Sequence, residues 1–286
     1  MDKIRTYIDS GKLAHIADGT RNLYETVFSK IKGFCDQENI QELDQSFEDR
    51  MSEFVDYLKD SGIGGTTIKS YLGIVRSFFK AIGLDISYTY KLTSSEKKQK
   101  QHKDINRVFN EEEVELCLNH SFASNNMRNQ IIVLLLHETG VRVNELANIR
   151  VKDIFMDEGH IKIKNSKTKI RYVFFSQKTK ELLVYYIRTL NHGDLFQEND
   201  CMLFDILVSQ IKKIIKQMLV DLDIDATGRG PHNFRHWAAT WLFFEGNMRI
   251  EDVATLLGDT PEIILSTYIH PTPRMLKKRV AKAWGW

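Results

Sequence analysis

The chain has 286 residues, of which 42% are hydrophobic and 27% charged, and its net charge is only +2. These proportions are typical of a soluble globular protein with one large or two modest domains. No stretch approaches the roughly 20 apolar residues that span a bilayer, and residues 1–12 lack the apolar core of a secretory signal, so we expect a cytoplasmic protein with no membrane partner. Three widely separated cysteines, Cys35, Cys117 and Cys201, argue against a disulfide framework and against a Cys-rich zinc site.

The first part of the chain, up to about Lys91, predicts short helices. In residues 21–34, apolar side chains recur at helical spacing at Leu23, Val27, Ile31 and Phe34. After the glycine-rich residues 62–65, Thr66 is expected to cap a second helix. The apolar positions of that helix indicate a core rather than a cofactor site, and they are Ile68, Tyr71, Leu72, Val75, Phe78 and Phe79.

Positive charge is concentrated in residues 91–107, which hold six basic and two acidic residues, a net charge of +4. The segment is polar and without apolar periodicity, which predicts a linker over residues 93–107 between a helical domain (1–92) and a larger domain (108–286). At ~3.3 Å per residue the linker can extend about 50 Å, enough to pass around a duplex. Concentrated positive charge favours a polyanionic partner, although an ordinary solvated linker explains it equally well.

The second part of the chain predicts mostly helices with one small β-element. Asn110 precedes three glutamates, a pattern typical of a helix start. Residues 128–138 are strongly apolar and predict a buried helix that ends at Thr139 and Gly140, and the helical pattern resumes over residues 143–149. Residues 160–175 alternate apolar and polar side chains and predict a β-hairpin. The pattern beyond the hairpin is helical through Leu219.

Two segments near this hairpin carry cations that need a reason for their position. Arg142 follows a glycine turn in residues 139–146 (TGVRVNEL). Arg142 either serves a functional site or forms an ordinary ion pair with Glu145 or Asp153. Lys167 stands at the expected tip of the hairpin, a place that lysines also occupy in ordinary turns.

Two further segments bring together a histidine, an arginine and a tyrosine. Pro231 begins a helix on which His232 and Arg235 share one face. His232 and His236 have the spacing of a helical zinc site, but the expected glutamate is missing and no third ligand is apparent, so no metal is expected. In residues 256–271 (LLGDTPEIILSTYIHP) a new helix begins after Gly258 and carries Tyr268 late in its course, where a tyrosine is ordinarily a core residue.

These residue types together suit a metal-free phosphoryl transfer at a DNA phosphodiester. Guanidinium groups bind nonbridging phosphate oxygens in pairs and stabilise the charge of the transition state. A tyrosine hydroxyl can attack phosphorus and store the bond as an ester. The departing 5′-oxygen needs a proton, which a positioned lysine can supply.

In order and spacing, these segments resemble the tyrosine recombinases, the lambda-integrase-like superfamily, and most closely its Xer-type site-specific recombinases of bacteria and archaea. The resemblance covers nearly the whole chain. Residues 66–79 resemble the core-binding domain of that family and TGVRVNEL its first arginine motif. HNFRH resembles its H-x-x-R-H box, and residues 256–270 its L-L-G-H…Y box.

The resemblance implies a role for each candidate residue. Arg142 and Arg235 would clamp the scissile phosphate, and Glu145 would support them from behind. His232 would assist proton transfer, and Lys167, rather than its hairpin neighbours Lys164 and Lys169, would be the general acid. Tyr268 would be the nucleophile and form a 3′-phosphotyrosyl intermediate.

One site residue departs from the family pattern. Asp259 stands where the family usually has histidine, or sometimes tryptophan. An ionised carboxylate cannot donate a hydrogen bond to phosphate and would repel it. Either Asp259 turns away, or the chemistry is slow, or the segment rearranges on assembly.

The expected protein is therefore a mainly α, two-domain DNA clamp that recombines DNA at a specific site, without cofactor, ATP or metal. The resemblance implies a tetramer on two duplexes, with a monomer or dimer when free, and favours Xer-type resolution of chromosome dimers in partition and cell division. The alternatives are an integrase of a mobile element, a strand passer similar to type IB topoisomerases, and a DNA-binding relative that has lost catalysis. Residues 273–286 predict an amphipathic helix that packs on its own domain or on a neighbouring protomer.

Overall fold

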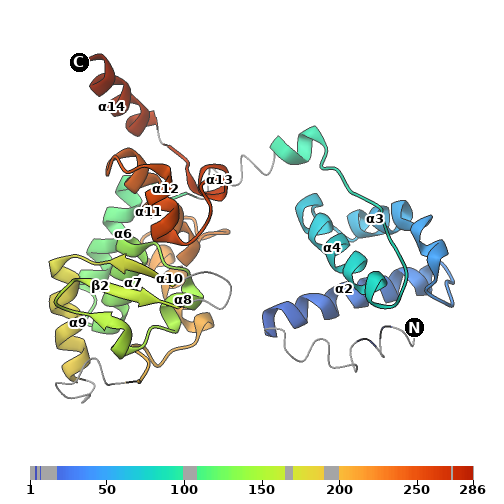
Figure 1. The fold of residues 1–286 in the computed structure, drawn as a ribbon, viewed down its shortest axis with the longest axis horizontal. Helices are drawn as coiled ribbons and strands as arrows, with labels where there is room; N and C mark the ends of the chain where they lie inside the picture. Colours follow the sequence, from blue (N-terminus) through green and yellow to red (C-terminus); the bar gives the residue numbers. More distant parts are fainter. Residues whose placement is uncertain are drawn as a thin grey trace. The chain divides into compact units, whose positions relative to one another are not determined.

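The computed structural model describes Ile4, Tyr7 and residues 18–98, 108–164, 170–189, 200–271 and 273–285. The chain divides into two compact units, Met1–Lys103 and Asp104–Trp286. Both are built mainly of helices, and the second also carries a small sheet (Figure 1). Among the helices of the described residues, none combines the length and apolar character needed to cross a membrane.

The first unit is a helical bundle with its own apolar core. Its elements are α2 (Asp18–Gln37), η1 (Gln45–Glu48), α3 (Met51–Asp60) and α4 (Gly65–Ala81). The helices α2, α3 and α4 contact one another. All the core positions predicted on α4 are buried, which confirms that helix.

Two local predictions for this unit were wrong. Leu23, which the spacing placed with the core residues, is 38% exposed, whereas Val27, Ile31 and Phe34 of the same pattern are buried. The N-cap of α4 is Gly64 rather than Thr66, and the helix begins at Gly65. A Cβ on Gly65 would lie 2.8 Å from Leu92 Cδ2, since the chain after α4 returns across the start of the helix.

The start of the predicted linker has local structure. Residues 94–98 are helical. The Glu96 carboxylate accepts hydrogen bonds from Tyr90 Oη at 2.7 Å and from the Thr93 backbone N–H at 2.8 Å, which fastens this turn to the first unit. Residues 99–107 lie outside the described residues.

The second unit surrounds one central helix with other helices and a sheet. Its helices are α6 (Glu111–Ala123), α7 (Met127–Thr139), α8 (Val143–Ala147), η2 (Val151–Asp153), α9 (Gln177–Thr189), α10 (Val208–Asp221), α11 (Pro231–Phe244), α12 (Ile250–Leu257), α13 (Pro261–Ile263), η3 (Ile264–Tyr268) and α14 (Pro273–Trp284). Helix α7 contacts α6, α9 and α11. Its residues 131–136 are all buried, as expected for a helix that is apolar on every side. The predicted buried helix and its end at Thr139 are confirmed.

The sheet confirms the predicted hairpin and adds one strand. The strands β1 (Ile154–Phe155), β2 (His160–Ile163) and β3 (Arg171–Phe174) are antiparallel in the order β1-β2-β3. Ile161 pairs with Val173, and both face the core. The predicted tip, residues 165–168, lies outside the described residues.

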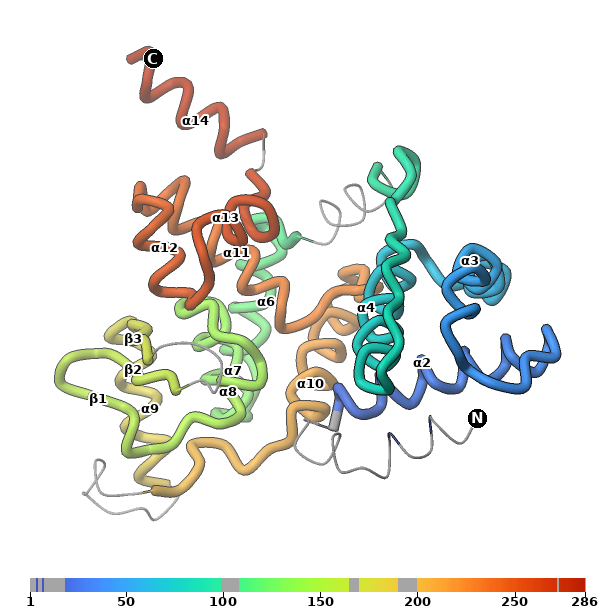
Figure 2. Tube along the Cα trace, turned by 45° about the vertical axis from the view of Figure 1, so that its right-hand side comes forward, coloured from blue at the N-terminus to red at the C-terminus, as the bar shows by residue number. Residues whose placement is uncertain are grey.

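The end of the chain completes one side of the second unit. Helices α11, α12 and α13 lie together, and α14 extends outward from them (Figures 1 and 2). Helix α12 also contacts β3, and η3 contacts α11. Together with the contact between α7 and α11, these contacts bring together three of the four segments singled out from the sequence: those that carry Arg142, His232 with Arg235, and Tyr268. The fourth, the hairpin tip with Lys167, lies outside the described residues.

Candidate active site

The turn that ends α7 positions Arg142. Gly140 has a left-handed φ of 60°, and a Cβ there would lie 2.7 Å from Leu257 Cδ2, so both conformation and packing require glycine. The Arg142 backbone N–H and Nη1 then donate to the two carboxylate oxygens of Glu145, at 2.8 and 3.0 Å. Of the two carboxylates named as alternative partners, Glu145 is the one that pairs with Arg142. Asp153 instead accepts from Lys164 at 2.6 Å.

Arg235 enters the same site from α11 and is fully buried. Pro231 occupies the first turn of this helix, as predicted. Arg235 Nη1 donates to the Gly140 carbonyl at 2.9 Å, and Nη2 donates to the Leu257 carbonyl at 2.8 Å. The guanidinium is therefore held between the end of α7 and the end of α12, with its plane fixed by backbone acceptors.

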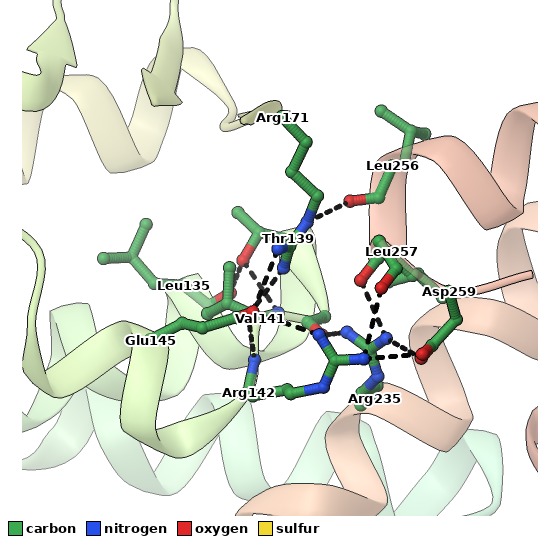
Figure 3. Close-up of polar contacts among 12 residues, drawn as sticks. Leu135, Thr139, Val141, Arg142, Glu145, Arg171, Arg235, Leu256, Leu257 and Asp259 are labelled. Atoms are coloured by element: carbon green, nitrogen blue, oxygen red, sulfur yellow. Dashed lines mark hydrogen bonds and ion pairs between the residues drawn. The ribbon is translucent and has the colours of Figure 1, made fainter. Parts of the chain in front are cut away.

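Asp259 connects the two arginines (Figure 3). Its Oδ1 lies 2.7 Å from Arg142 Nη2, and its Oδ2 lies 2.5 Å from Arg235 Nη2. The side chain is 14% exposed and follows Gly258, whose left-handed φ of 69° ends α12. Asp259 therefore does not turn away in this structure, and its carboxylate lies between the two guanidinium groups.

Sequence reasoning missed Arg171, which lies directly behind these residues. Arg171 is buried at the start of β3, and its two Nη atoms donate to the two Glu145 oxygens at 2.9 and 2.6 Å. Its Nε donates to the Leu256 carbonyl at 2.9 Å. A signal was available, because the strand alternation places Arg171 on the same inward face as Val173.

The charge of Glu145 is fixed by these arginines. Burial alone raises the pKa of the Glu145 carboxyl, but the hydrogen bonds and charges of Arg171 and Arg142 outweigh burial and lower this pKa to about 2. Burial likewise lowers the pKa of Arg142, and the carboxylates of Glu145 and Asp259 reverse that effect and raise it. Both groups are fully ionised near neutral pH.

Tyr268 ends the π-helical turn η3 and packs directly on the site. The residue is 6% exposed. The Arg235 guanidinium carbon lies 4.9 Å from the centre of its ring, and the His236 ring lies 4.9 Å away. Thr240 Oγ1 donates to the Tyr268 carbonyl at 3.0 Å and so holds the backbone of this residue on α11.

His232, the first of the two histidines on α11, lies beside Tyr268. His232 keeps an exposed surface, and its ring centre lies 5.4 Å from that of Tyr268. Its pKa is lowered, first by partial desolvation within the site and then by the charges of Arg235 and Arg142. Among the described residues, no three His, Cys, Asp or Glu side chains are grouped so that they could hold a metal ion.

The site therefore joins five of the six candidate residues: Arg142, His232, Arg235, Asp259 and Tyr268. Lys167, the sixth, lies in residues 165–169, outside the described residues, together with Lys169. Lys164 on the same hairpin is in an ion pair with Asp153. The arrangement presents two guanidinium groups that share one anion, with a phenol packed on one of them, which is suited to binding a phosphodiester and attacking it.

Comparison with protein families agrees with this chemistry. The Phage integrase family matches residues 107–275, and the Phage integrase SAM-like domain matches residues 1–83. The chain belongs to the phage integrase family and is a tyrosine-type site-specific recombinase, an enzyme that cleaves and rejoins DNA strands. Independence of cofactors is typical of this family. The predicted resemblance is confirmed.

The curated relatives include full-length Xer recombinases. Tyrosine recombinase XerA of Saccharolobus solfataricus is 25% identical over 292 residues, covering 99% of this chain and 92% of the relative. Tyrosine recombinase XerC of Staphylococcus epidermidis is 24% identical and covers 97% of this chain and 96% of the relative. These similarities support closeness to the Xer type.

Solved structures confirm the predicted fold class. The crystal structure of XerA recombinase has a TM-score of 0.54 at 20% identity and covers 99% of this chain and 98% of that chain. The XerH recombinase bound to palindromic difH substrate, a post-cleavage complex, has a TM-score of 0.69 at 20% identity, covering 91% and 78%. The mainly α architecture with a small sheet is therefore that of the tyrosine recombinases.

Proposed function

We propose that this chain is a Xer-type recombinase that cleaves double-stranded DNA at a specific site through a 3′-phosphotyrosyl intermediate on Tyr268. One observation carries the proposal: Arg235 shares an anion with Arg142 and packs its guanidinium on the Tyr268 ring. The proposed nucleophile and the two cations that would hold the phosphate thus belong to one cluster of contacts.

The proposed step exchanges one ester bond for another. Tyr268 Oη loses its proton and bonds to phosphorus, while the bond from phosphorus to the 5′-oxygen breaks. His232, whose lowered pKa keeps it neutral near pH 7, is suited to accept the phenol proton. Lys167 would give a proton to the departing 5′-oxygen, and Arg142 and Arg235 would neutralise the two nonbridging oxygens. Attack by a 5′-hydroxyl reverses the step and reseals the strand.

The proposed substrate is a duplex held between the two domains. Residues 1–92 would bind the core of the site, residues 108–286 would carry out the chemistry, and residues 93–107 would join them around the DNA. The working assembly would be a tetramer on two sites. The matches to recombinases named XerA and XerC support the Xer type. Within that type we propose resolution of chromosome dimers, with integration of a mobile element as the alternative.

A second candidate function is supported by Asp259. Its carboxylate fills the position between the two arginines that a phosphate would need. A relative that binds DNA sites without cleaving them would be compatible with such a filled site. The two functions differ in one measurable product, the covalent protein–DNA adduct.

The test uses a nicked suicide substrate that carries the site which this protein selects from a random-sequence DNA library. We expect the unmodified chain to form a covalent adduct that survives denaturation. Tyr268→Phe is expected to abolish the adduct because it removes the attacking oxygen, and to retain DNA binding. Tyr185→Phe is the matched control, because Tyr185 is 59% exposed on α9, and it should form adduct normally.

Arg142→Ala should also slow cleavage by roughly 100-fold or more, because it removes a charge that stabilises the transition state. Binding without adduct by the unmodified chain would favour the second function. Adduct formation by Tyr268→Phe would move the nucleophile to another residue.

A further inference from the structure

The anion that occupies the arginine clamp is part of the protein itself. Arg142 and Arg235 each give one Nη2 hydrogen bond to a different oxygen of Asp259. A phosphodiester offers two nonbridging oxygens that could be bound in the same way, one to each guanidinium. Two cations that share one planar carboxylate in this manner form a complete anion-binding site, and here the anion is already present (Figure 3).

We propose that Asp259 is an internal competitor of the scissile phosphate: its carboxylate closes the clamp in the DNA-free chain, and a phosphodiester must displace it before cleavage. This inference rests on the proposed function, since it assigns the same two arginines to the phosphate. It differs from loss of catalysis, because the closed clamp is reversible. The exchange replaces one anion with another at two unmoved guanidinium groups.

The two arginines are held by other groups when Asp259 leaves. Arg235 retains the carbonyls of Gly140 and Leu257. Arg142 retains the Glu145 carboxylate at 3.0 Å and the Gly258 carbonyl at 3.2 Å. Displacement of Asp259 therefore leaves both guanidinium groups in place, so the clamp is preorganised for the incoming phosphate.

Asp259 itself is held more loosely than the arginines. Within the described part of the chain, its carboxylate has no partner other than these two guanidinium groups. The residue lies in the short turn between α12 and α13, where only its backbone N–H is fixed, by the Ala254 carbonyl at 3.1 Å. A rotation of this one side chain opens the clamp without unfolding either helix.

The charges of the site explain why the competition is effective. Arg142, Arg171 and Arg235 contribute three positive charges, and Glu145 and Asp259 contribute two negative charges. Glu145 is committed to Arg171 through two hydrogen bonds of 2.9 and 2.6 Å, so Asp259 is the exchangeable anion. While Asp259 stays, a phosphate meets a like charge and an occupied pair of donors. Without the charge of Asp259, three arginines and Glu145 leave the site with a net charge of +2, which attracts the phosphate.

The first test measures binding of inorganic sulfate, a simple tetrahedral anion, by titration calorimetry at constant ionic strength. We expect Asp259→Asn to bind sulfate at least about tenfold more tightly than the unmodified chain, since a hydrogen bond to a charged group is worth more than a tenfold change in affinity. Asp252→Asn is the matched control, because Asp252 on α12 also pairs with an arginine, the N-cap residue Arg249, but at an exposed position. It should bind sulfate as the unmodified chain does.

The same titration also shows where the sulfate binds. Adding Arg142→Gln to Asp259→Asn should remove the gain in affinity. Equal sulfate affinity for Asp259→Asn and the unmodified chain would overturn the proposal, and so would a gain that survives Arg142→Gln. If Asp259→Asn does not give a cooperative thermal transition, Asp259→His replaces it, because histidine carries no negative charge and is the residue that the family usually has there.

The second test measures the rate of adduct formation on the nicked substrate. Asp259→Asn and Asp259→His are expected to cleave at least as fast as the unmodified chain, and Asp252→Asn at the unmodified rate. A severe loss of adduct by folded Asp259→His would show that the carboxylate is needed for cleavage and would overturn the proposal. The closed clamp and the proposed function can be contradicted by different results. If no variant forms adduct but sulfate affinity rises as expected, the clamp is closed by Asp259 and the proposed function is wrong.

Discussion

Arg171 joins three elements through one guanidinium. It binds Glu145 of α8, the Leu256 carbonyl of α12 and, through its own backbone, the strand β3 that leads from the hairpin. Since Glu145 in turn orients Arg142, a displacement of Arg171 is transmitted to the phosphate clamp. Arg171 does not reach the site between Arg142 and Arg235, and we interpret it as a positioning residue.

Replacing Arg171 should therefore have two separate effects, one on the free energy of unfolding and one on the rate of adduct formation. Arg171→Met leaves the Glu145 charge buried without its main partner, which we expect to cost about 3–5 kcal/mol in the free energy of unfolding. The double variant Arg171→Met/Glu145→Gln removes both charges and should recover most of that stability. It should still form adduct at least about tenfold more slowly, because Arg142 has lost its orienting carboxylate.

Denaturant unfolding and single-turnover cleavage measure the two effects separately. The exposed arginine Arg249 provides the control, since Arg249→Met should leave both quantities nearly unchanged. A double variant that regains stability and full cleavage rate together would reduce Arg171 to a purely structural role.

His236 makes the second unit sensitive to acid. Its pKa is lowered to about 3, first by burial and then by the charges of His232, His270 and Arg235. The unfolded chain takes up this proton near pH 6.5, whereas the folded chain does so only near pH 3. The contribution of His236 to the free energy of unfolding is therefore fully present above about pH 6.5 and is lost as the pH falls from 6.5 toward 3.

Thermal unfolding between pH 7 and pH 4 measures this loss. His236→Gln should flatten the pH dependence, because glutamine does not titrate. An unchanged slope in His236→Gln would assign the acid sensitivity to other groups.

At the residue scale, sequence patterns identified candidate residues that the structure brings together and the supporting residue Glu145, and they missed Arg171. Arg142, His232, Arg235 and Tyr268 were found because their order along the chain follows a known pattern. The pairing of Arg142 with Asp259 joins residues 117 positions apart, and that of Arg171 with Glu145 joins residues 26 apart. Such contacts depend on how α12 and β3 pack, which no local spacing encodes.

At the element scale, the strength of the local pattern decided what could be predicted. Helix α7 and the β2–β3 hairpin were predicted correctly, because a continuous apolar run and a clear alternation each have one structural solution. The strand β1 and the turn η2 have two and three residues and are too short to show any period. The π-helical geometry of η3 was also missed, since the pattern predicted one continuous helix there.

Helix α14 tests how the end of the chain takes part in assembly. Leu276 and Val280 are 46% and 45% exposed, whereas Met275 is buried in the core of the second unit. Deletion from Leu276 onward therefore removes both exposed apolar residues and keeps the core contact of Met275. We expect this truncated chain to bind a single DNA site normally, and to lose cooperative pairing of sites and recombination.

Gel shifts on one-site and two-site DNA measure that difference. A matched control changes only the charge of the helix, with Lys282→Gln. Assembly and recombination at the unmodified rates by the truncated chain would show that α14 acts only within its own unit.

At the scale of the whole molecule, binding and chemistry are expected to be separable. The described part of each unit has its own apolar core, and the family matches fall on either side of the basic segment, at residues 1–83 and 107–275. The net charge of +4 in residues 91–107 favours phosphate contacts that do not depend on the active site. Variants of Arg142, Arg235 and Tyr268 should therefore lose cleavage. They should retain DNA affinity, and that affinity should weaken as the salt concentration rises.

The most direct test of the proposed chemistry is to locate the covalent bond between protein and DNA. The adduct on the nicked substrate is digested with nuclease and trypsin, and the modified peptide is sequenced by mass spectrometry. Cleavage after Arg249 and Arg274 gives a peptide of residues 250–274, in which Tyr268 is the only tyrosine. We predict a phosphonucleotide on Tyr268, joined to the 3′ end of the cleaved strand. A nucleotide on any other residue, or attachment through the 5′ end, would contradict the account.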